Sequence, residues 1–253
     1  MDIITAGILG IVEGLTEFLP VSSTGHLIIV NQWLSFSPEF TKTFDVVIQL
    51  GAILAVLIYF RSRLRPPFGI WKKAIVAVIP ALILGALFGG MIQTALFSPA
   101  VVAWALIIGG IVILAVERRP KPPAIIEADS VSYKKAVFVG LIQCLALIPG
   151  TSRSAASVVG GRLLGMSREV AAEFSFFLAV PTMLAASGYS LLKGGMHMTG
   201  HEAFLLAVGF VVSFLVAWAV IGAFMRYIKT RDFRVFGWYR IALGVIVLIF
   251  LAR

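Results

Sequence analysis

The sequence predicts an all-α integral membrane protein with six transmembrane helices plus two re-entrant helix-loop-helix pairs, arranged as two inverted repeats. Of the 253 residues, 60% are hydrophobic and 13% are charged. The mean hydropathy of +1.01 is far above that of a soluble domain with a polar surface. The apolar runs also fall into two classes, one long enough to span a bilayer and one too short. We therefore expect a single transmembrane domain over 1–253.

Six apolar runs approach or reach the roughly 17 to 25 residues that a membrane-spanning helix needs. They cover 44–60, 74–94, 100–116, 170–192, 203–225 and 237–252, of which the last is marginal in length. The apolar N-terminus follows no basic region and contains no small-residue cleavage site. We therefore expect the first segment to be retained and not removed as a signal peptide.

Four other apolar runs are too short to span the hydrocarbon core. They cover 3–19, 26–34, 136–148 and 155–165, and at 1.5 Å per residue they reach roughly 14 to 25 Å against a core of about 30 Å. They form two pairs, broken at 20–26 and 149–154 by proline, glycine and hydroxyl residues. Each pair is predicted to be re-entrant, with its non-helical tip lining a cavity. The alternative is that each pair forms one kinked spanning helix.

Charge placement favours re-entry over crossing. If both pairs re-enter, 16 of the 21 lysine and arginine residues lie on one side of the membrane. These residues are in the loops 61–73 and 117–135, at Arg162 and Arg168, and between Arg226 and Arg234. Three lie on the other side, namely Lys42, Lys193 and Arg253, while Arg153 and Arg240 fall within apolar segments and are not counted. The positive-inside rule then puts both termini outside, and it explains the net charge of +9 without nucleic-acid binding.

The chain also repeats its own pattern. A broken pair followed by three spans occupies 1–117, a polar connector covers 118–133, and the same order returns over 134–253. Because each half contains an odd number of spans, the two halves must be inverted relative to each other. One broken pair then enters from each face of the membrane, and their tips meet near the midplane.

Four ionisable residues lie within apolar sequence, namely Glu13, Glu17, His26 and Arg153. Each costs about 2.5 to 3.5 kcal/mol to insert, so together they suggest a function. Glu13 and Glu17 are four residues apart and share one helix face. Two such carboxylates can share a proton or bind a hard divalent cation such as Mg²⁺ or Ca²⁺. The alternative is that they pair with Arg153 or reach interfacial water.

The first break supplies three hydroxyls, Ser22, Ser23 and Thr24, at the start of a new half-helix. The free N–H groups and positive dipole end of that helix favour an anion such as phosphate. Ordinary N-capping is the alternative. His26 lies three residues after Ser23 and can act as a general acid or base or as a phosphate acceptor, or can simply be packed.

The second break contains Gly150, which lets the backbone approach a ligand, followed by Thr151, Ser152, Arg153 and Ser154. The guanidinium of Arg153 matches the paired oxygens of a diphosphate well, while an ion pair with a glutamate is the alternative. Outside the breaks, Asp45 is a weaker candidate for a site role, and Arg240 is expected to pair with its neighbours.

The segments 13–26 (EGLTEFLPVSSTGH) and 149–154 (PGTSRS) resemble the signatures of the bacterial undecaprenyl-diphosphate phosphatase family, the bacitracin-resistance proteins. The segments 44–51 and 236–240 extend the resemblance over nearly the whole chain. It implies hydrolysis of undecaprenyl diphosphate to undecaprenyl phosphate and inorganic phosphate in the bacterial inner membrane. This reaction recycles the lipid carrier of peptidoglycan and cell-wall polysaccharide synthesis and confers bacitracin resistance. The resemblance also implies a divalent cation and a site open to the periplasmic or outer side.

Transferred by position, the resemblance assigns catalytic, substrate-binding and metal-binding residues. We expect Ser23, His26, Glu17, Glu13 and Arg153 to be catalytic, and Glu13 and Glu17 to hold the metal. Substrate contacts are expected from Ser22, Thr24, Gly25, Gly150, Thr151, Ser152 and Ser154. In our preferred mechanism Ser23 attacks phosphorus and Glu17 or His26 takes its proton, with a His26 phosphoenzyme or a directly activated water as competing accounts.

The main alternative function is a lipid-phosphate transporter or flippase, because inverted repeats with broken helices are a transporter architecture. A phosphatidic-acid type of phosphatase fits less well, since no histidine follows Ser152 until His197. The expected partners are a polyprenyl diphosphate substrate and membrane lipids, and the sequence leaves a homodimer open.

Overall fold

The computed structural model describes residues 1–33, 38–66, 68–118, 122–194 and 199–250. Within these ranges the regular structure is helical, apart from one isolated bridge between Ile125 and Met166. The helices are α1 (Ile3–Thr16), α2 (Ser23–Trp33), α3 (Pro38–Tyr59), α4 (Gly69–Leu96), α5 (Pro99–Arg118), α6 (Tyr133–Gln143), α7 (Arg153–Leu163), α8 (Arg168–Gly194), α9 (Gly200–Ile228) and α10 (Arg234–Phe250). Short 3₁₀ turns cover Arg61–Leu64, Ala128–Ser130 and Cys144–Leu147.

In the described part of the chain the six predicted spans fall in α3, α4, α5, α8, α9 and α10, with Phe60 just after the end of α3 and residues 251–252 outside the described ranges. Among the described residues, α4, α5, α8 and α9 are long and apolar enough to cross a membrane. Large apolar side chains point outward from these helices, such as Leu87, which is 68% exposed, and Met91, which is 64% exposed. An outer surface of this kind suits contact with lipid, and the prediction of an all-helical membrane protein is confirmed at this level.

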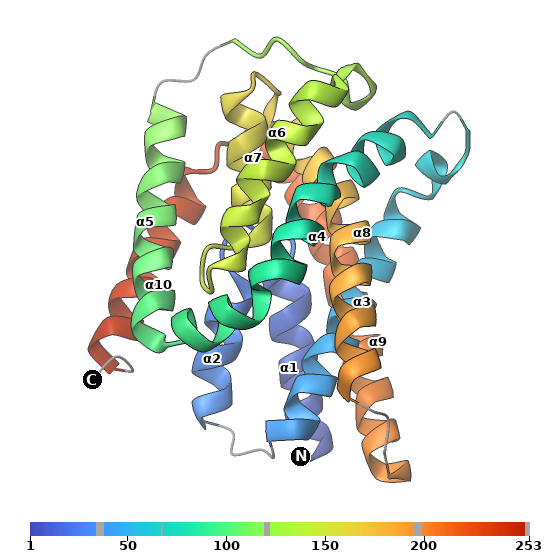
Figure 1. Cartoon of the computed structure of the whole chain (residues 1–253), viewed down its shortest axis with the longest axis vertical. Helices are drawn as coiled ribbons and strands as arrows, with labels where there is room; N and C mark the ends of the chain where they lie inside the picture. Colours follow the sequence, from blue (N-terminus) through green and yellow to red (C-terminus); the bar gives the residue numbers. More distant parts are fainter. Residues whose placement is uncertain (34–37, 67, 119–121, 195–198, 251–253) are drawn as a thin grey trace.

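The two broken pairs are helical hairpins. Figure 1 shows α1 and α2 in the half of the bundle that contains the N-terminus, and α6 and α7 in the opposite half. Both reversals end on a serine with positive φ, which is 73° at Ser22 and 71° at Ser152. The hydroxyl of Ser154 in the second hairpin donates to the carbonyl of Leu19 in the first at 2.7 Å. The tips therefore meet in the middle of the bundle.

The long helices surround these hairpins. Helix α1 packs against α3 and α9, α6 packs against α4, α7 packs against α8, and α5 packs against α10. Phe18, at the first break, is fully buried and meets the ring of Phe176 edge-on at 5.4 Å. The breaks are therefore enclosed by protein, as irregular backbone at membrane depth requires.

The basic loops gather at one end of the molecule, opposite the N-terminus (Figure 1). Asp129 accepts from Arg63 at 2.6 Å, and Lys73 donates to the backbone carbonyl of Asp129 at 2.5 Å. At the same end the buried carboxylate of Glu117 pairs with Arg168 and with Arg162. These contacts bring three of the predicted basic loops together, as the charge pattern requires.

Candidate active site

Glu17 joins the two hairpins through both of its carboxylate oxygens. Its Oε2 accepts a hydrogen bond from the Ser23 hydroxyl at 2.6 Å, and its Oε1 accepts from Arg153 Nη2 at 2.9 Å. Glu17 and Ser23 are each 8% exposed, so this network is largely shielded from solvent. Glu17 is thus in direct contact with two other predicted catalytic residues, of which Arg153 lies 136 positions away in the chain.

The guanidinium of Arg153 is also held by its surroundings. Its Nη1 donates to the backbone carbonyl of Ser175 at 3.0 Å, and its Cζ lies 5.7 Å from the centre of the Phe18 ring. Its Nε has no acceptor in the described part of the chain. The ion pair with Glu17, which the sequence left open, therefore exists and still leaves one N–H available for a ligand.

The second break presents the backbone amides of Ser152, Arg153 and Ser154, a group that we call the cradle. Ser152 caps α7 by accepting from the amide of Ala155 at 3.2 Å. The Ser154 hydroxyl donates to Leu19, so the 3.0 Å contact between Ser152 and Ser154 has Ser152 as its donor. Among the described groups, none accepts from the amides of Ser152, Arg153 or Ser154. Successive free amides at a helix N-terminus form a site for an anion.

The first break also combines an N-capping serine with free backbone amides. Ser22 Oγ accepts from the amide of Gly25 at 3.4 Å, which is the geometry of an N-cap. The amides of Ser23 and Thr24 have no acceptor within the described ranges. Capping therefore accounts for Ser22, while the hydroxyl of Ser23 points instead to Glu17.

His26 is turned toward α10. Its Nδ1 lies 2.8 Å from the carbonyl oxygen of Ser22, and its Nε2 lies 2.6 Å from the hydroxyl of Tyr239, whose ring stacks on it. Because a carbonyl can only accept, Nδ1 carries a proton, and in the neutral ring Nε2 then accepts from Tyr239. The side chain that accepts from the Ser23 hydroxyl is therefore Glu17 and not His26.

Glu13 is fully buried, and neither of its carboxylate oxygens has a hydrogen-bond partner in the described residues. The charged groups that act on it are Glu17, Asp45 and Arg153. Unpartnered buried carboxylate oxygens suit a hard cation. In the described ranges no group of three or more acidic, histidine or cysteine side chains could hold a metal. A cation here would therefore need phosphate oxygens as further ligands.

The remaining predicted residues shape the tips. Gly150 has φ of 89°, and a Cβ on it would lie 2.6 Å from the carbonyl oxygen of Val102, so this position requires glycine. The amide of Thr151 donates to Ile148 at 3.2 Å. Gly25 is buried and Thr24 is half-buried in the first turn of α2.

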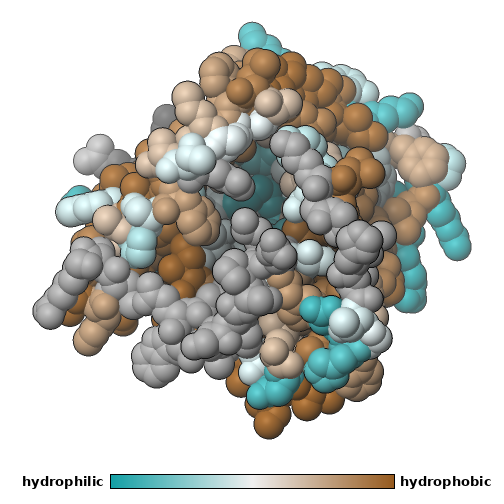
Figure 2. Space-filling model, turned by 60° about the horizontal axis from the view of Figure 1, so that its bottom comes forward, coloured by the Kyte–Doolittle hydropathy of each residue, from teal (hydrophilic) through white to brown (hydrophobic). Residues whose placement is uncertain are grey.

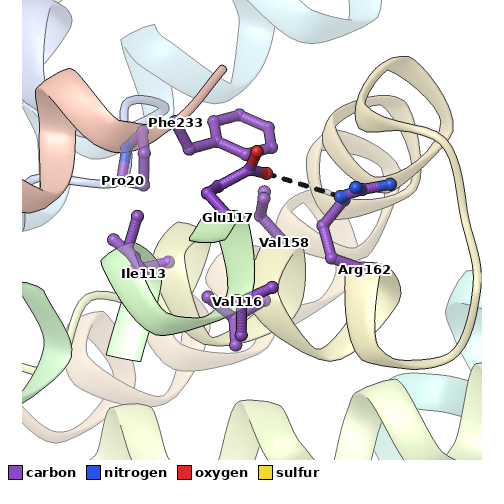
Figure 3. A pocket seen from close by; sticks show the side chains of 9 residues that line it. Pro20, Ile113, Val116, Glu117, Val158, Arg162 and Phe233 are labelled. Atoms are coloured by element: carbon purple, nitrogen blue, oxygen red, sulfur yellow. Dashed lines mark ion pairs between the residues drawn. The ribbon is translucent and has the colours of Figure 1, made fainter. Parts of the chain in front are cut away.

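Two hollows differ in what they can hold. Figure 2 shows that the end of the molecule bearing the N-terminus is hollowed, with hydrophilic residues on the floor of the hollow. A separate cavity beside the Glu117–Arg162 ion pair is lined largely by apolar side chains such as Ile113 and Phe233 (Figure 3). Its volume of about 10 Å³ is too small for a phosphate group.

Comparison with known proteins identifies the family. The family model described as bacitracin resistance protein BacA matches residues 6–246. The chain belongs to the BacA family. It is 52% identical to undecaprenyl-diphosphatase 1 of Clostridioides difficile (strain 630), over 98% of this chain and 96% of that protein. It is 51% identical to the undecaprenyl-diphosphatase of Wolinella succinogenes, over 99% of each chain, and 45% identical to that of Enterococcus faecalis, over 100% and 98%.

The BacA match includes both signature segments and confirms the resemblance seen in the sequence. Sequence reasoning missed two contacts from α10, which are Tyr239 on His26 and Arg240 on the backbone of both breaks. A signal existed for Arg240, because a charged residue within an apolar run is costly and needs a partner at depth. Its partners are backbone carbonyls, which no side-chain pattern reveals.

Proposed function

We propose that the protein hydrolyses undecaprenyl diphosphate to undecaprenyl phosphate and inorganic phosphate in the bacterial inner membrane. The observation that carries the proposal is the network in which Glu17 binds both Ser23 and Arg153, flanked by the free amides of two helix N-termini. A hydroxyl bound to a carboxylate, beside a guanidinium and free amides, is the combination that nucleophilic attack on a phosphate requires. The names of the relatives supply the substrate. This activity recycles the carrier lipid of cell-wall synthesis and accounts for bacitracin resistance.

The chemistry starts at the Ser23 hydroxyl. Glu17 accepts its proton across the 2.6 Å hydrogen bond as Oγ attacks the terminal phosphorus. The bond between that phosphorus and the bridging oxygen breaks, undecaprenyl phosphate leaves, and water then hydrolyses the phosphoserine. The free Nε of Arg153 and the amides of Ser152 to Ser154 bind the equatorial oxygens.

The two competing accounts are less well supported. A His26 phosphoenzyme would need Nε2, which accepts from Tyr239, or Nδ1, which donates to Ser22. A water activated directly by Glu17 would have to share that carboxylate with the Ser23 hydroxyl, which already donates to it at 2.6 Å. Ser23 is therefore the nucleophile we favour.

A divalent cation, Mg²⁺ or Ca²⁺, would be held by Glu13 and Glu17 together with oxygens of the substrate. The unpartnered oxygens of Glu13 support this assignment. When bound, such a cation supplies positive charge to the phosphate oxygens and the leaving group.

In the membrane we propose six spans and two re-entrant hairpins within one domain, as two inverted repeats over 1–117 and 134–253. The basic loops face the cytoplasm, which puts the N-terminus and the hollow of Figure 2 on the outer side. A diphosphate head group would then enter the hollow from the outer leaflet while its chain stays in lipid.

The test is phosphate release from a short-chain prenyl diphosphate by the purified protein, with and without a chelator. Wild type should release phosphate, and Arg153→Ala should lower turnover by about 10² to 10³-fold. Arg162→Ala is the matched control, because the polar contacts of this arginine are to Glu117 and Met166 and not to Glu17, Ser23 or Arg153. A wild-type protein that binds the substrate but releases no phosphate would instead be a transporter.

A further inference from the structure

Arg240 in α10 is the largest fully buried side chain in the described part of the protein. It has no carboxylate partner within ion-pair distance in that part of the chain. An arginine at membrane depth is costly, and its usual partners are anions or backbone carbonyls. Here all of its hydrogen bonds go to carbonyls.

These carbonyls belong to both breaks. Nη2 donates to Gly150 at 3.1 Å, to Thr151 at 3.0 Å and to Ala105 of α5 at 3.1 Å. Nη1 lies 3.4 Å from the carbonyl oxygen of Pro20. Pro20 and Gly150 occupy equivalent places, each two residues before a serine of positive φ. One guanidinium therefore binds the corresponding peptide group in each hairpin.

The orientation of these peptides decides where their amides point. In a trans peptide the C=O of one residue and the N–H of the next point in opposite directions. When the Thr151 carbonyl turns toward Arg240, the Ser152 amide turns away from it, and that amide has no acceptor within the described ranges. Arg240 thus orients the first amide of the cradle that precedes Arg153.

The neighbouring helix is shaped around this guanidinium. A Cβ on Gly109 of α5 would lie 3.0 Å from Cζ of Arg240 and still closer to Nη2. Position 109 therefore admits no side chain while Arg240 keeps its place.

We propose that Arg240 is a positioning residue for the phosphatase reaction, whose guanidinium holds the two breaks in register and aims the Ser152 amide at the diphosphate. This inference rests on the proposed function. Its positive charge also lies beside the site, because the guanidinium contacts the backbone of Gly150 and Thr151. We attribute the role of Arg240 mainly to the shape of its guanidinium and less to its charge. A lysine at this position would keep the charge but could not donate to three separate segments.

Two changes perturb this arrangement independently. Arg240→Lys keeps the positive charge but removes the planar guanidinium with its several N–H donors. Gly109→Ala keeps the arginine but displaces its guanidinium. Their matched controls are Arg162→Lys, a buried arginine at the basic end, and Gly89→Ala, a helical glycine with no atom within 4 Å of the added Cβ.

The experiment measures kcat and KM for phosphate release together with the binding of inorganic pyrophosphate, all below the melting temperature of each variant. Arg240→Lys and Gly109→Ala should each lower kcat about 10²-fold, because a shift of about 1 Å in positioning groups has that effect. Both should weaken pyrophosphate binding about tenfold, which corresponds to the loss of one good hydrogen bond to a charged group. Both controls should stay close to wild type in all three quantities.

The inference is overturned if both test variants match wild type in kcat and in pyrophosphate affinity. It is also overturned if the control variants lose as much, because the effect would then be general destabilisation. Pyrophosphate binding is measured without turnover, so this outcome stays separate from a failure of the proposed hydrolysis, which wild type and Arg153→Ala decide.

Discussion

Replacing Glu17 by glutamine tests the proposed role of this carboxylate most directly. Glutamine has almost the same shape, so the packing of the first break is kept. What is lost is the negative charge that accepts from Ser23 at 2.6 Å and from Arg153 at 2.9 Å. The amide can still accept one of these hydrogen bonds, but it cannot take the serine proton.

Two effects follow, one on turnover and one on stability. Removal of a general base in contact with the nucleophile should lower kcat by about 10² to 10⁴-fold. Arg153 is only 11% exposed, so its charge loses a buried partner. Breaking a buried pair from one side costs roughly 3 to 5 kcal/mol. The carbonyl of Ser175 still accepts from this guanidinium, which puts the expected loss at the lower end.

Glu117→Gln separates the two effects. Glu117 is 1% exposed and pairs with Arg162 and Arg168, but it lies at the basic end of the bundle. Thermal unfolding in detergent should show a similar loss of stability in the two variants. Phosphate release, measured well below both melting temperatures, should collapse only in Glu17→Gln. If Glu17→Gln keeps kcat within tenfold of wild type, Glu17 is not the base on Ser23.

Three further predictions concern the same network. Ser23→Ala should lower kcat by several orders of magnitude while binding of a prenyl diphosphate persists, and near-normal turnover would remove Ser23 as the nucleophile. Glu13→Gln should abolish the effect of a chelator on phosphate release and lower the affinity for Mg²⁺ or Ca²⁺ in titrations, since neither oxygen of Glu13 has a hydrogen-bond partner among the described residues; an unchanged affinity would move the cation site elsewhere. Tyr239→Phe removes the donor to His26 Nε2 and should free that nitrogen. The NMR resonances of the His26 ring should therefore change, while kcat falls less than tenfold. A loss as large as that of Ser23→Ala would place His26 and Tyr239 in the chemical step.

The sequence predicted much of the architecture because the information is local. Six apolar runs and two broken pairs follow from residue length and hydropathy, and all reappear as helices within a few residues of the expected ends. The charge pattern correctly grouped the basic loops, because the membrane sorts lysine and arginine by side regardless of packing. The contacts of Glu117 with Arg162 and Arg168 fit that grouping.

The contacts within the candidate site could be predicted from the sequence only in part. Glu13 and Glu17 share a helix face by spacing, yet only Glu17 meets Ser23, because α1 ends at Thr16 and Glu17 lies at the start of the reversal. The Ser22 capping role and the Ser23 contact could not be separated from three adjacent hydroxyls. The positive φ of Ser22 is likewise a property of the folded backbone.

By itself the sequence determined that this chain is a membrane protein and that its polar breaks need protein around them, and it predicted that acids, hydroxyls and a guanidinium bind an anion. These conclusions hold because burying a charge in hydrocarbon is costly wherever the chain goes. Only the tertiary structure decided which groups touch. His26 meets Tyr239 from 213 residues away, and Arg240 binds carbonyls 220 and 90 residues away. Backbone carbonyls are the same in every residue, so their partners are set by how the helices pack and by no pattern of side chains.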